Sequence, residues 1–285
     1  MVSSNSRLCG LIGWPVRHSL SPAMHNAAFA ATGLDGVYLG FEVPPERLHR
    51  AMKGMAALGF LGCNLTVPHK ETARGACGRL DPDAQRFGAV NTLTFEDGTA
   101  VGHNTDAAGF LRALQVELGC DPQGARALVL GAGGVARAVV GALMQAGADV
   151  IAVAARTPGR AEVLLDALAF ACGRVVPWTE TEVRAEVAQA ELVVSCLPPE
   201  AQPLGLEALP ARAVVLDVAY ERETALLRAA HRAGARAAGG LEMLVQQGAL
   251  SFELWTRQAA PIDIMRAAAQ AELAARRERR TAPEP

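Results

Sequence analysis

One glycine-rich segment constrains the fold of this chain more than any other. Gly131, Gly133 and Ala136 form a G-x-G-x-x-A pattern. The pattern lies directly after the apolar run 127–130 and opens a helical pattern over 135–146. The glycines permit a tight turn and close approach of a pyrophosphate, and the helix N-terminus offers N–H groups and partial positive charge to phosphates. The segment therefore predicts a doubly wound dinucleotide-binding domain, and a glycine turn used only for packing fits this context less well.

The end of the next predicted strand, 150–154, indicates which dinucleotide is bound. An NAD-binding domain places an acidic residue about 20 positions after the glycine turn, where it holds the ribose 2′-hydroxyl. This chain has Ala155, Arg156 and Thr157 at that point, with Arg160 one turn later. A guanidinium group binds a phosphate as a fork, whereas a carboxylate would repel it. We therefore predict NADP rather than NAD, although the arginines alone are also compatible with a solvated helix start.

Composition excludes several classes of protein. The chain has 285 residues, of which 51% are hydrophobic and 20% charged, which is typical of a folded protein with two domains. The formal net charge of -2 provides no basic field for nucleic acid or an anionic membrane. Charged residues, glycine or proline interrupt every apolar stretch before it reaches bilayer length. We expect no nucleic-acid or membrane partner, and the N-terminal segment does not resemble a signal peptide.

The six cysteines are scattered, without C-x-x-C spacing and without histidines at metal-ligand intervals. We expect reduced thiols in a cytoplasmic protein that needs no metal.

Short apolar runs alternate with helical patterns along the chain, which is typical of α/β architecture. We predict a catalytic substrate-binding domain over residues 1–105 and a Rossmann-type domain over 106–240. Two helices within 241–276 are expected to join the first domain, and 277–285 to be a disordered tail. The predicted strands lie near 8–12, 37–42, 61–66, 92–95, 127–130, 150–154, 192–196 and 213–218. The predicted helices cover 22–32, 45–58, 107–118, 135–146, 159–171, 224–233, 241–256 and 261–276.

The first domain carries two serines, Ser19 and Ser21, just before its first predicted helix. Two hydroxyls together with a helix N-terminus can hold a small carboxylate. The alternative is ordinary capping, with Ser21 as the N-cap and Pro22 in the first turn.

A second polar group in the first domain includes Lys70 and Asp106. Lys70 closes the stretch 62–70, Asn91 lies in the stretch 88–92, and Asp106 follows Asn104 and Thr105. These residues fall at strand ends and loops, where α/β domains place their sites. A lysine beside a carboxylate in a cleft can give and take a proton, although each residue alone is more often a surface residue.

The chain resembles the shikimate dehydrogenase family over almost its whole length. The motifs GxPxxHSxSPxxHN, GxNxTxPxK, GAVNT, NTDxxG, GAGG, xRTxxR and MLxxQ…FxxWT occur in family order. The resemblance implies reversible reduction of 3-dehydroshikimate to shikimate with NADPH, in the biosynthesis of chorismate and aromatic amino acids. It also implies a small-molecule substrate, and we expect a monomer or a homodimer.

The resemblance also implies roles for individual residues. Lys70 and Asp106 match the catalytic pair. The substrate-contacting positions are Ser19, Ser21, Thr66, Asn91, Tyr220 and Gln247. The cofactor-contacting positions are Gly131, Ala132, Gly133, Gly134, Val135, Ala155, Arg156, Thr157, Arg160, Val218 and Gly240.

Some positions depart from the family pattern. Ala155 stands where the family usually has asparagine, so one polar contact near the adenosine phosphate is expected to be missing. The stretch 195–199 replaces a family Asn-Ala-Thr-like segment, and Arg222 replaces the usual proline after Tyr220.

Two other functions are less consistent with the residues. A quinate/shikimate dehydrogenase that prefers NAD would want an acid where Arg156 stands, and a non-catalytic shikimate sensor would not need Lys70 or Asp106.

Overall fold

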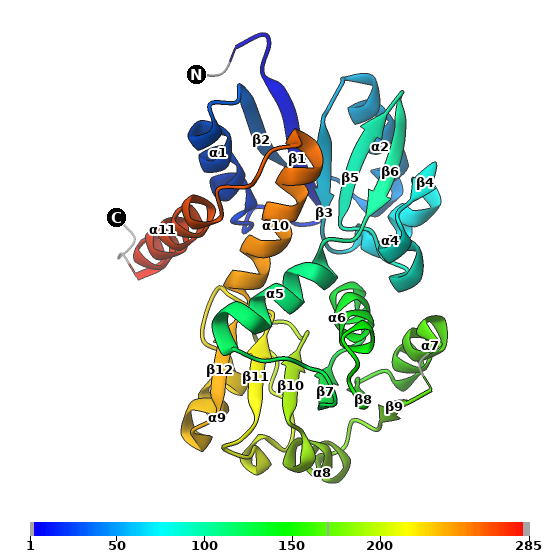
Figure 1. Ribbon diagram of the computed structural model, residues 1–285, viewed down its shortest axis with the longest axis vertical. Coiled ribbons are helices and arrows are strands. Elements are labelled where there is room, and N and C mark those ends of the chain that lie inside the picture. Colours follow the sequence, from blue (N-terminus) through cyan, green and yellow to red (C-terminus); the bar gives the residue numbers. More distant parts are fainter. Residues whose placement is uncertain (1–2, 170, 282–285) are drawn as a thin grey trace. The chain divides into compact units, whose positions relative to one another are not determined.

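The computed structural model describes residues 3–169 and 171–281, and it confirms the predicted α/β class (Figure 1). The chain divides into two compact units. The first unit combines the segment up to Thr105 with the segment from Leu244 onward, and the second unit runs from Asp106 to Met243. Each unit contains its own six-stranded sheet.

The sheet of the first unit is mixed, with the spatial order β2-β1-β3-β5-β6-β4. β1 pairs in parallel with β2 and β3, whereas β5 runs antiparallel to β3 and β6. Because β1, β2 and β3 are parallel, the loops that follow them leave from one edge of the sheet. The strands are β1 (Arg7–Gly13), β2 (Gly36–Glu42), β3 (Gly62–Leu65), β4 (Arg79–Leu80), β5 (Thr92–Glu96) and β6 (Thr99–His103).

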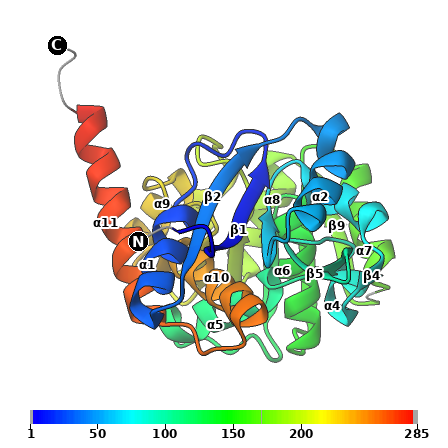
Figure 2. The same cartoon turned by 90° about the horizontal axis from the view of Figure 1, so that it is seen from above.

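Helices from both ends of the chain complete the first unit. Figure 2 shows α11 lying beside α1, two helices that are far apart in the sequence. Apolar side chains of β1, β3, β5 and α2 form one core cluster, which includes Ile12, Met52, Leu65 and Leu93. The helices are α1 (Ser21–Thr32), α2 (Leu48–Ala57), α3 (His69–Thr72), α4 (Pro82–Phe87), α10 (Leu241–Thr256), whose first turn belongs to the second unit, and α11 (Ile262–Thr281).

The sheet of the second unit is entirely parallel, with the order β12-β11-β10-β7-β8-β9. Numbered within the unit, this is the order 6-5-4-1-2-3 of a dinucleotide-binding fold. The order reverses between β7 and β10, and ligands bind at such a switch point. The strands are β7 (Arg126–Leu130), β8 (Val150–Ala154), β9 (Gly173–Val176), β10 (Leu192–Ser195), β11 (Val214–Asp217) and β12 (Arg236–Gly239).

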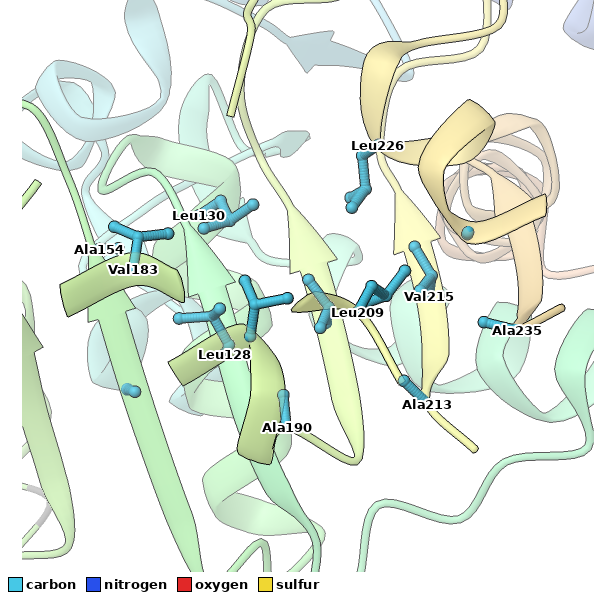
Figure 3. Packing of buried hydrophobic residues seen from close by; sticks show 14 of the residues in the cluster. Leu128, Leu130, Ala154, Val183, Ala190, Leu209, Ala213, Val215, Leu226 and Ala235 are labelled. Carbon is cyan, nitrogen blue, oxygen red and sulfur yellow. The ribbon is translucent and has the colours of Figure 1, made fainter. Parts of the chain in front are cut away.

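A continuous apolar core supports this second sheet. Figure 3 shows strand residues such as Leu128 and Val215 facing Val183 and Leu226 of the covering helices. The strand positions are buried on both faces, which explains their short unbroken apolar runs. The helices are α5 (Asp106–Leu118), α6 (Gly134–Gln145), α7 (Pro158–Leu168), α8 (Glu180–Gln189) and α9 (Ala225–Ala233).

Several helix ends differ from the sequence-based expectation, among them the start of α2 at Leu48 rather than at residue 45. Leu20 rather than Ser21 is the N-cap of α1, and Ser21 is instead hydrogen-bonded to the Tyr38 side chain. Helix α7 ends at Leu168, because Ala169 adopts the left-handed conformation with φ 51°. Helix α11 continues to Thr281, so residues 277–281 are helical rather than part of a disordered tail.

Ion pairs lie along the C-terminal part of α11. Glu272 pairs with Arg276 one turn later and also with Arg279, and such pairs favour the helix. Residues 282–285, the rest of the predicted tail, lie outside the described residues.

Two features are absent from the described part of the chain. No helix within 3–169 and 171–281 is long and apolar enough to cross a membrane. The same residues contain no group of three or more His, Cys, Asp or Glu side chains that could hold a metal ion.

A close contact between β3 and α10 fixes the C-terminal part of the first unit. Trp255 of α10 is 6% exposed and donates from Nε1 to the Leu93 carbonyl at 2.9 Å. A Cβ atom on Gly62 would collide with the Trp255 ring and with the Leu93 carbonyl. Glycine is therefore required at position 62 for the indole to lie close against the sheet.

We predict opposite effects for two glycine-to-alanine substitutions in this unit. Gly62→Ala overpacks the Trp255 contact and is expected to lower the free energy of unfolding by about 1–3 kcal/mol or more. Gly54→Ala, in α2, has open space around the new methyl group and is expected to raise it by about 0.5–1 kcal/mol. Urea unfolding followed by tryptophan fluorescence measures both, and equal stability of the two variants would contradict the packing argument.

Candidate functional site

The glycine turn lies at the switch point of the second unit. It follows β7, and Gly131 has φ 109°, a conformation that favours glycine. A Cβ atom there would lie 3.2 Å from the Cys196 carbonyl oxygen, so the turn packs closely on the loop after β10. Gly133 is the N-cap of α6, has open space where a side chain would stand, and offers no side-chain cap. Gly134 and Val135 begin the helix, and their amides are available to a phosphate.

The arginines at the end of β8 meet the requirement for a 2′-phosphate. Ala155 is 5% exposed, whereas Arg156, Thr157 and Arg160 are exposed at the start of α7. β8 pairs directly with β7, so this segment and the glycine turn leave the same edge of adjacent strands. The residues present therefore fit NADP: an open glycine cradle for the pyrophosphate and two exposed guanidinium groups one strand away.

Val218 and Gly240 are brought together in the second unit. They follow β11 and β12, which are paired, and Gly240 N–H donates to the Ala219 carbonyl at 3.0 Å. A Cβ atom on Gly240 would overlap the backbone of Val218. Half-buried Tyr220 lies two residues beyond Val218.

Asp217 organises this loop and was missed by the sequence reasoning. Its carboxylate is 2% exposed and accepts hydrogen bonds from Thr224 Oγ1 at 2.7 Å and from the Ala219 N–H at 3.1 Å. Burial raises the pKa of this carboxyl group, and the hydrogen bonds oppose the shift. Asp217 ends a buried strand, which is the feature in the sequence that could have identified it.

In the first unit, the loops after β1 and β3 lie side by side. Thr66 N–H donates to the Ile12 carbonyl at 2.9 Å, and Trp14 N–H donates to the Val67 carbonyl at 3.0 Å. A Cβ atom on Gly13 would collide with the Thr66 methyl group. These contacts bring Thr66 close to the loop that carries the two serines.

Lys70 lies on the short helix α3, which the sequence reasoning did not predict. The carbonyl of Lys70 accepts from the Val90 N–H at 2.7 Å, so α3 adjoins the loop that carries Asn91. The buried neighbour His69 places a ring nitrogen 2.8 Å from the Val43 carbonyl and anchors the helix. Burial lowers the pKa of His69, which favours the neutral ring.

Asn91 and Gln247 are joined by a hydrogen bond from Asn91 Nδ2 to Gln247 Oε1 at 3.2 Å. Asn91 is 1% exposed; it also donates to Thr105 Oγ1 at 2.9 Å and accepts from the Thr105 N–H at 2.8 Å. Asp106, which is buried, is the next residue and opens α5 of the second unit. Lys70 belongs to the first unit, so the two proposed catalytic residues lie on different units.

A buried hydrogen-bond network links Ser21 to Asn91, and sequence reasoning missed its central members. The Ser21 side chain is hydrogen-bonded to that of Tyr38, whose hydroxyl donates to Asn64 Oδ1 at 2.8 Å. Asn64 Nδ2 donates to Thr92 Oγ1 at 3.0 Å, and this hydroxyl is 3.1 Å from Asn91 Oδ1. Asn64 belongs to the GxNxTxPxK motif, and this motif is the feature of the sequence that could have identified it.

The ring of His25 packs against this hydrogen-bond network. The ring is fully buried, stacks on Tyr38 at 4.3 Å and contacts Trp255 at 5.2 Å. Burial lowers the pKa of His25 to about 3, so the ring is neutral near pH 7. Burial also raises the pKa of Tyr38 well above its usual range, which keeps the phenol protonated as the donor to Asn64.

Comparison with known proteins identifies both units. The family model for the shikimate dehydrogenase substrate binding domain matches residues 11–93, and the shikimate/quinate 5-dehydrogenase model matches 114–210. A model for the shikimate 5'-dehydrogenase C-terminal domain matches 240–270.

Individual proteins agree with these models. The shikimate dehydrogenase (NADP(+)) of Methanopyrus kandleri is 46% identical over 278 residues, covering 94% of this chain and 96% of the relative. A shikimate dehydrogenase crystallised with NADP+ is 35% identical with a TM-score of 0.87, covering 96% of this chain and 98% of that one. The enzyme of Thermus thermophilus, solved with NADP(H) and shikimate, is 39% identical with a TM-score of 0.84, covering 93% and 99%. The chain belongs to the shikimate dehydrogenase family.

Proposed function

We propose that this chain catalyses the reversible NADP-dependent reduction of 3-dehydroshikimate to shikimate. The observation that carries the proposal is the polar set of the first unit, in which Asn91, Gln247 and Thr105 meet in a buried network that continues to Ser21. Amide and hydroxyl groups held in fixed positions suit a polyhydroxylated ring. The related proteins named for NADP, and the Thermus thermophilus structure with NADP(H) and shikimate, support the same activity.

Substrate binding is assigned to residues of the first unit, and the family resemblance implies Tyr220 as a further contact. Ser19 and Ser21 receive the carboxylate at the start of α1, where the helix N-terminus adds partial positive charge. Asn91 and Gln247 bind the ring hydroxyls, with Thr66 beside the serine loop. These assignments rest on the family resemblance together with the contacts described above.

Proton transfer is assigned to Lys70 with Asp106. Reduction of the carbonyl produces negative charge on oxygen, and the Lys70 ammonium donates a proton there. Asp106 is the second member of the catalytic pair that the family resemblance implies. When bound, NADPH supplies the hydride equivalent. The bound cofactor is held by the glycine turn residues Gly131, Ala132, Gly133, Gly134 and Val135, by Ala155, Arg156, Thr157 and Arg160, and by Val218 and Gly240.

The wider setting follows from the same family relationship. The reaction belongs to the biosynthesis of chorismate and the aromatic amino acids. None of the six cysteines, all of which lie within the described residues, forms a disulfide, which suits a reducing cytoplasm. A monomer or a homodimer stays our prediction for the oligomeric state.

Two assays test the function and its alternative. Absorbance at the nicotinamide band is followed with shikimate plus NADP, and then with shikimate or quinate plus NAD. We expect turnover with shikimate and NADP. Faster turnover of quinate with NAD would favour the quinate dehydrogenase alternative, and no turnover with any pair would favour a sensor.

Lys70→Ala is expected to lower kcat by about 10²–10⁴-fold, because a positioned general acid is lost. Binding of shikimate and NADP should persist, since other residues hold the carboxylate and the phosphates. Lys53, exposed on α2, is the matched control, and Lys53→Ala should keep wild-type kcat. A loss of less than about tenfold in kcat, with binding intact by calorimetry, would contradict the role of Lys70.

Ser19→Ala and Ser21→Ala are expected to raise KM for shikimate more than they lower kcat. A hydrogen bond to a charged group contributes about 1.5–3 kcal/mol, so each substitution should cost roughly tenfold or more in binding. Ser4, exposed near the N-terminus, provides the control substitution Ser4→Ala. An unchanged KM in the Ser19/Ser21 double variant would mean that the two serines stabilise the loop and do not bind the substrate.

Arg156→Asp is expected to lower kcat/KM with NADP by at least about 100-fold, or roughly 2.7 kcal/mol. The substitution removes attraction for the 2′-phosphate and adds repulsion. With NAD, kcat/KM should change little or rise, because the new carboxylate can accept the ribose hydroxyl. Arg212→Asp, an exposed position before β11, controls for net charge. Equal losses with both cofactors would show that Arg156 does not discriminate between them.

A further inference from the structure

The C-terminal helix reaches back to the loop that carries the two serines. Arg276 of α11 donates from Nη1 to the His18 carbonyl at 2.6 Å and from Nη2 to the Ser19 carbonyl at 2.9 Å. These partners are 258 and 257 residues away in the sequence. One guanidinium fork thus holds two consecutive carbonyl groups of the loop.

The packing of α11 fixes the position of this arginine. Met265 and Ala269 are fully buried, and Glu272 and Arg276 continue their spacing of three and four residues along the same face. This helix lies beside α1 (Figure 2). Glu272 Oε1 accepts from Arg276 Nε at 2.7 Å, and this bond is the main reason that the pKa of Glu272 lies below its usual value. The guanidinium group is therefore held from its own helix while it holds the loop.

Apart from Arg276, the exposed ion pair of Arg17 with Glu42 and the hydrogen bond of the Ser21 side chain with Tyr38 tie the loop to β2. Ser19 N–H donates to the Val16 carbonyl at 2.9 Å, and Ser19 Oγ accepts from the Ser21 N–H at 3.2 Å. Both bonds lie within the loop itself. The contacts from Arg276 connect it to a packed helix, and charge-assisted hydrogen bonds of this kind are stronger than neutral ones.

We propose that Arg276 is a positioning residue for substrate binding. It fixes the backbone of His18 and Ser19 so that the Ser19 and Ser21 hydroxyls are oriented for the substrate carboxylate before substrate arrives. The inference rests on the proposed function of the two serines. It makes the part of α11 beyond residues 240–270, the range matched by the C-terminal domain model, a component of the binding apparatus.

A cavity beside the fork makes the proposal testable by chemical rescue. Its volume is about 630 Å³, and its lining includes Arg17, Ser19, Glu42, Glu272 and Arg276. When the Arg276 side chain is removed, a guanidinium ion can enter this space, pair with Glu272 and donate to the two carbonyls.

The test compares Arg276→Ala and Arg276→Lys with Arg279→Ala, the matched control. Arg279 also pairs with Glu272 at 3.1 Å but belongs to the exposed face of the helix. We expect Arg276→Ala to raise KM for shikimate about tenfold, with kcat and KM for NADP changed less than about twofold. Arg276→Lys should be intermediate, because an ammonium group cannot form the same fork. Arg279→Ala should match the wild type.

Rescue and hydrogen exchange complete the test. Millimolar guanidinium chloride should lower KM for shikimate in Arg276→Ala, whereas urea should not. Without substrate, amide exchange of residues 17–21 should be faster in Arg276→Ala than in Arg279→Ala. An unchanged KM, or proportional losses in kcat and both KM values, would overturn the proposal. Failure of the wild type to turn over shikimate would instead overturn the proposed function, and the exchange result would still report on the loop contact.

Discussion

The buried amides of Asn64 and Asn91 hold the first unit together around its site. A polar group removed from water costs free energy unless it is hydrogen-bonded, and each of these amides has partners on several elements. Asn64 joins Tyr38 of β2 to Ser251 of α10, and Asn91 joins Gln247 of α10 to the segment before α5. Polar contacts as well as apolar packing therefore hold α10 in the first unit.

Local patterns were enough to predict the glycine turn of the second unit and four of its six strands, whereas β9, β12 and α8 were not predicted. The glycine turn, the apolar strand after it and Arg156 lie within one strand–helix–strand unit, so their spacing in the sequence reflects their spacing in the structure. The short hairpin of β5 and β6 was also marked in the sequence, by Asp97 and Gly98 at its turn, but was not recognised. Both have positive φ, 49° and 76°, which is the requirement of such a turn.

Contacts between distant segments could not be predicted in the same way. Tyr38 and Asn64 are 26 residues apart, and Arg276 and Ser19 are 257 apart. A buried tyrosine in an apolar strand resembles any core residue, and an arginine in a charged helix resembles any solvated one. Only the fold shows that their polar ends meet the loops of the site. The roles of Lys70 and Asp106 likewise depend on family resemblance rather than on spacing.

The second unit is a continuous segment inserted between two parts of the first. During synthesis, the whole second unit has left the ribosome before α11 is complete, and domains generally fold as units as they emerge. The first unit can complete its packing only after α10 has been synthesised, because Trp255 packs against Gly62 and Ser251 accepts a hydrogen bond from Asn64. The nascent chain can therefore complete its dinucleotide domain before the first unit receives the C-terminal helices that cover its sheet.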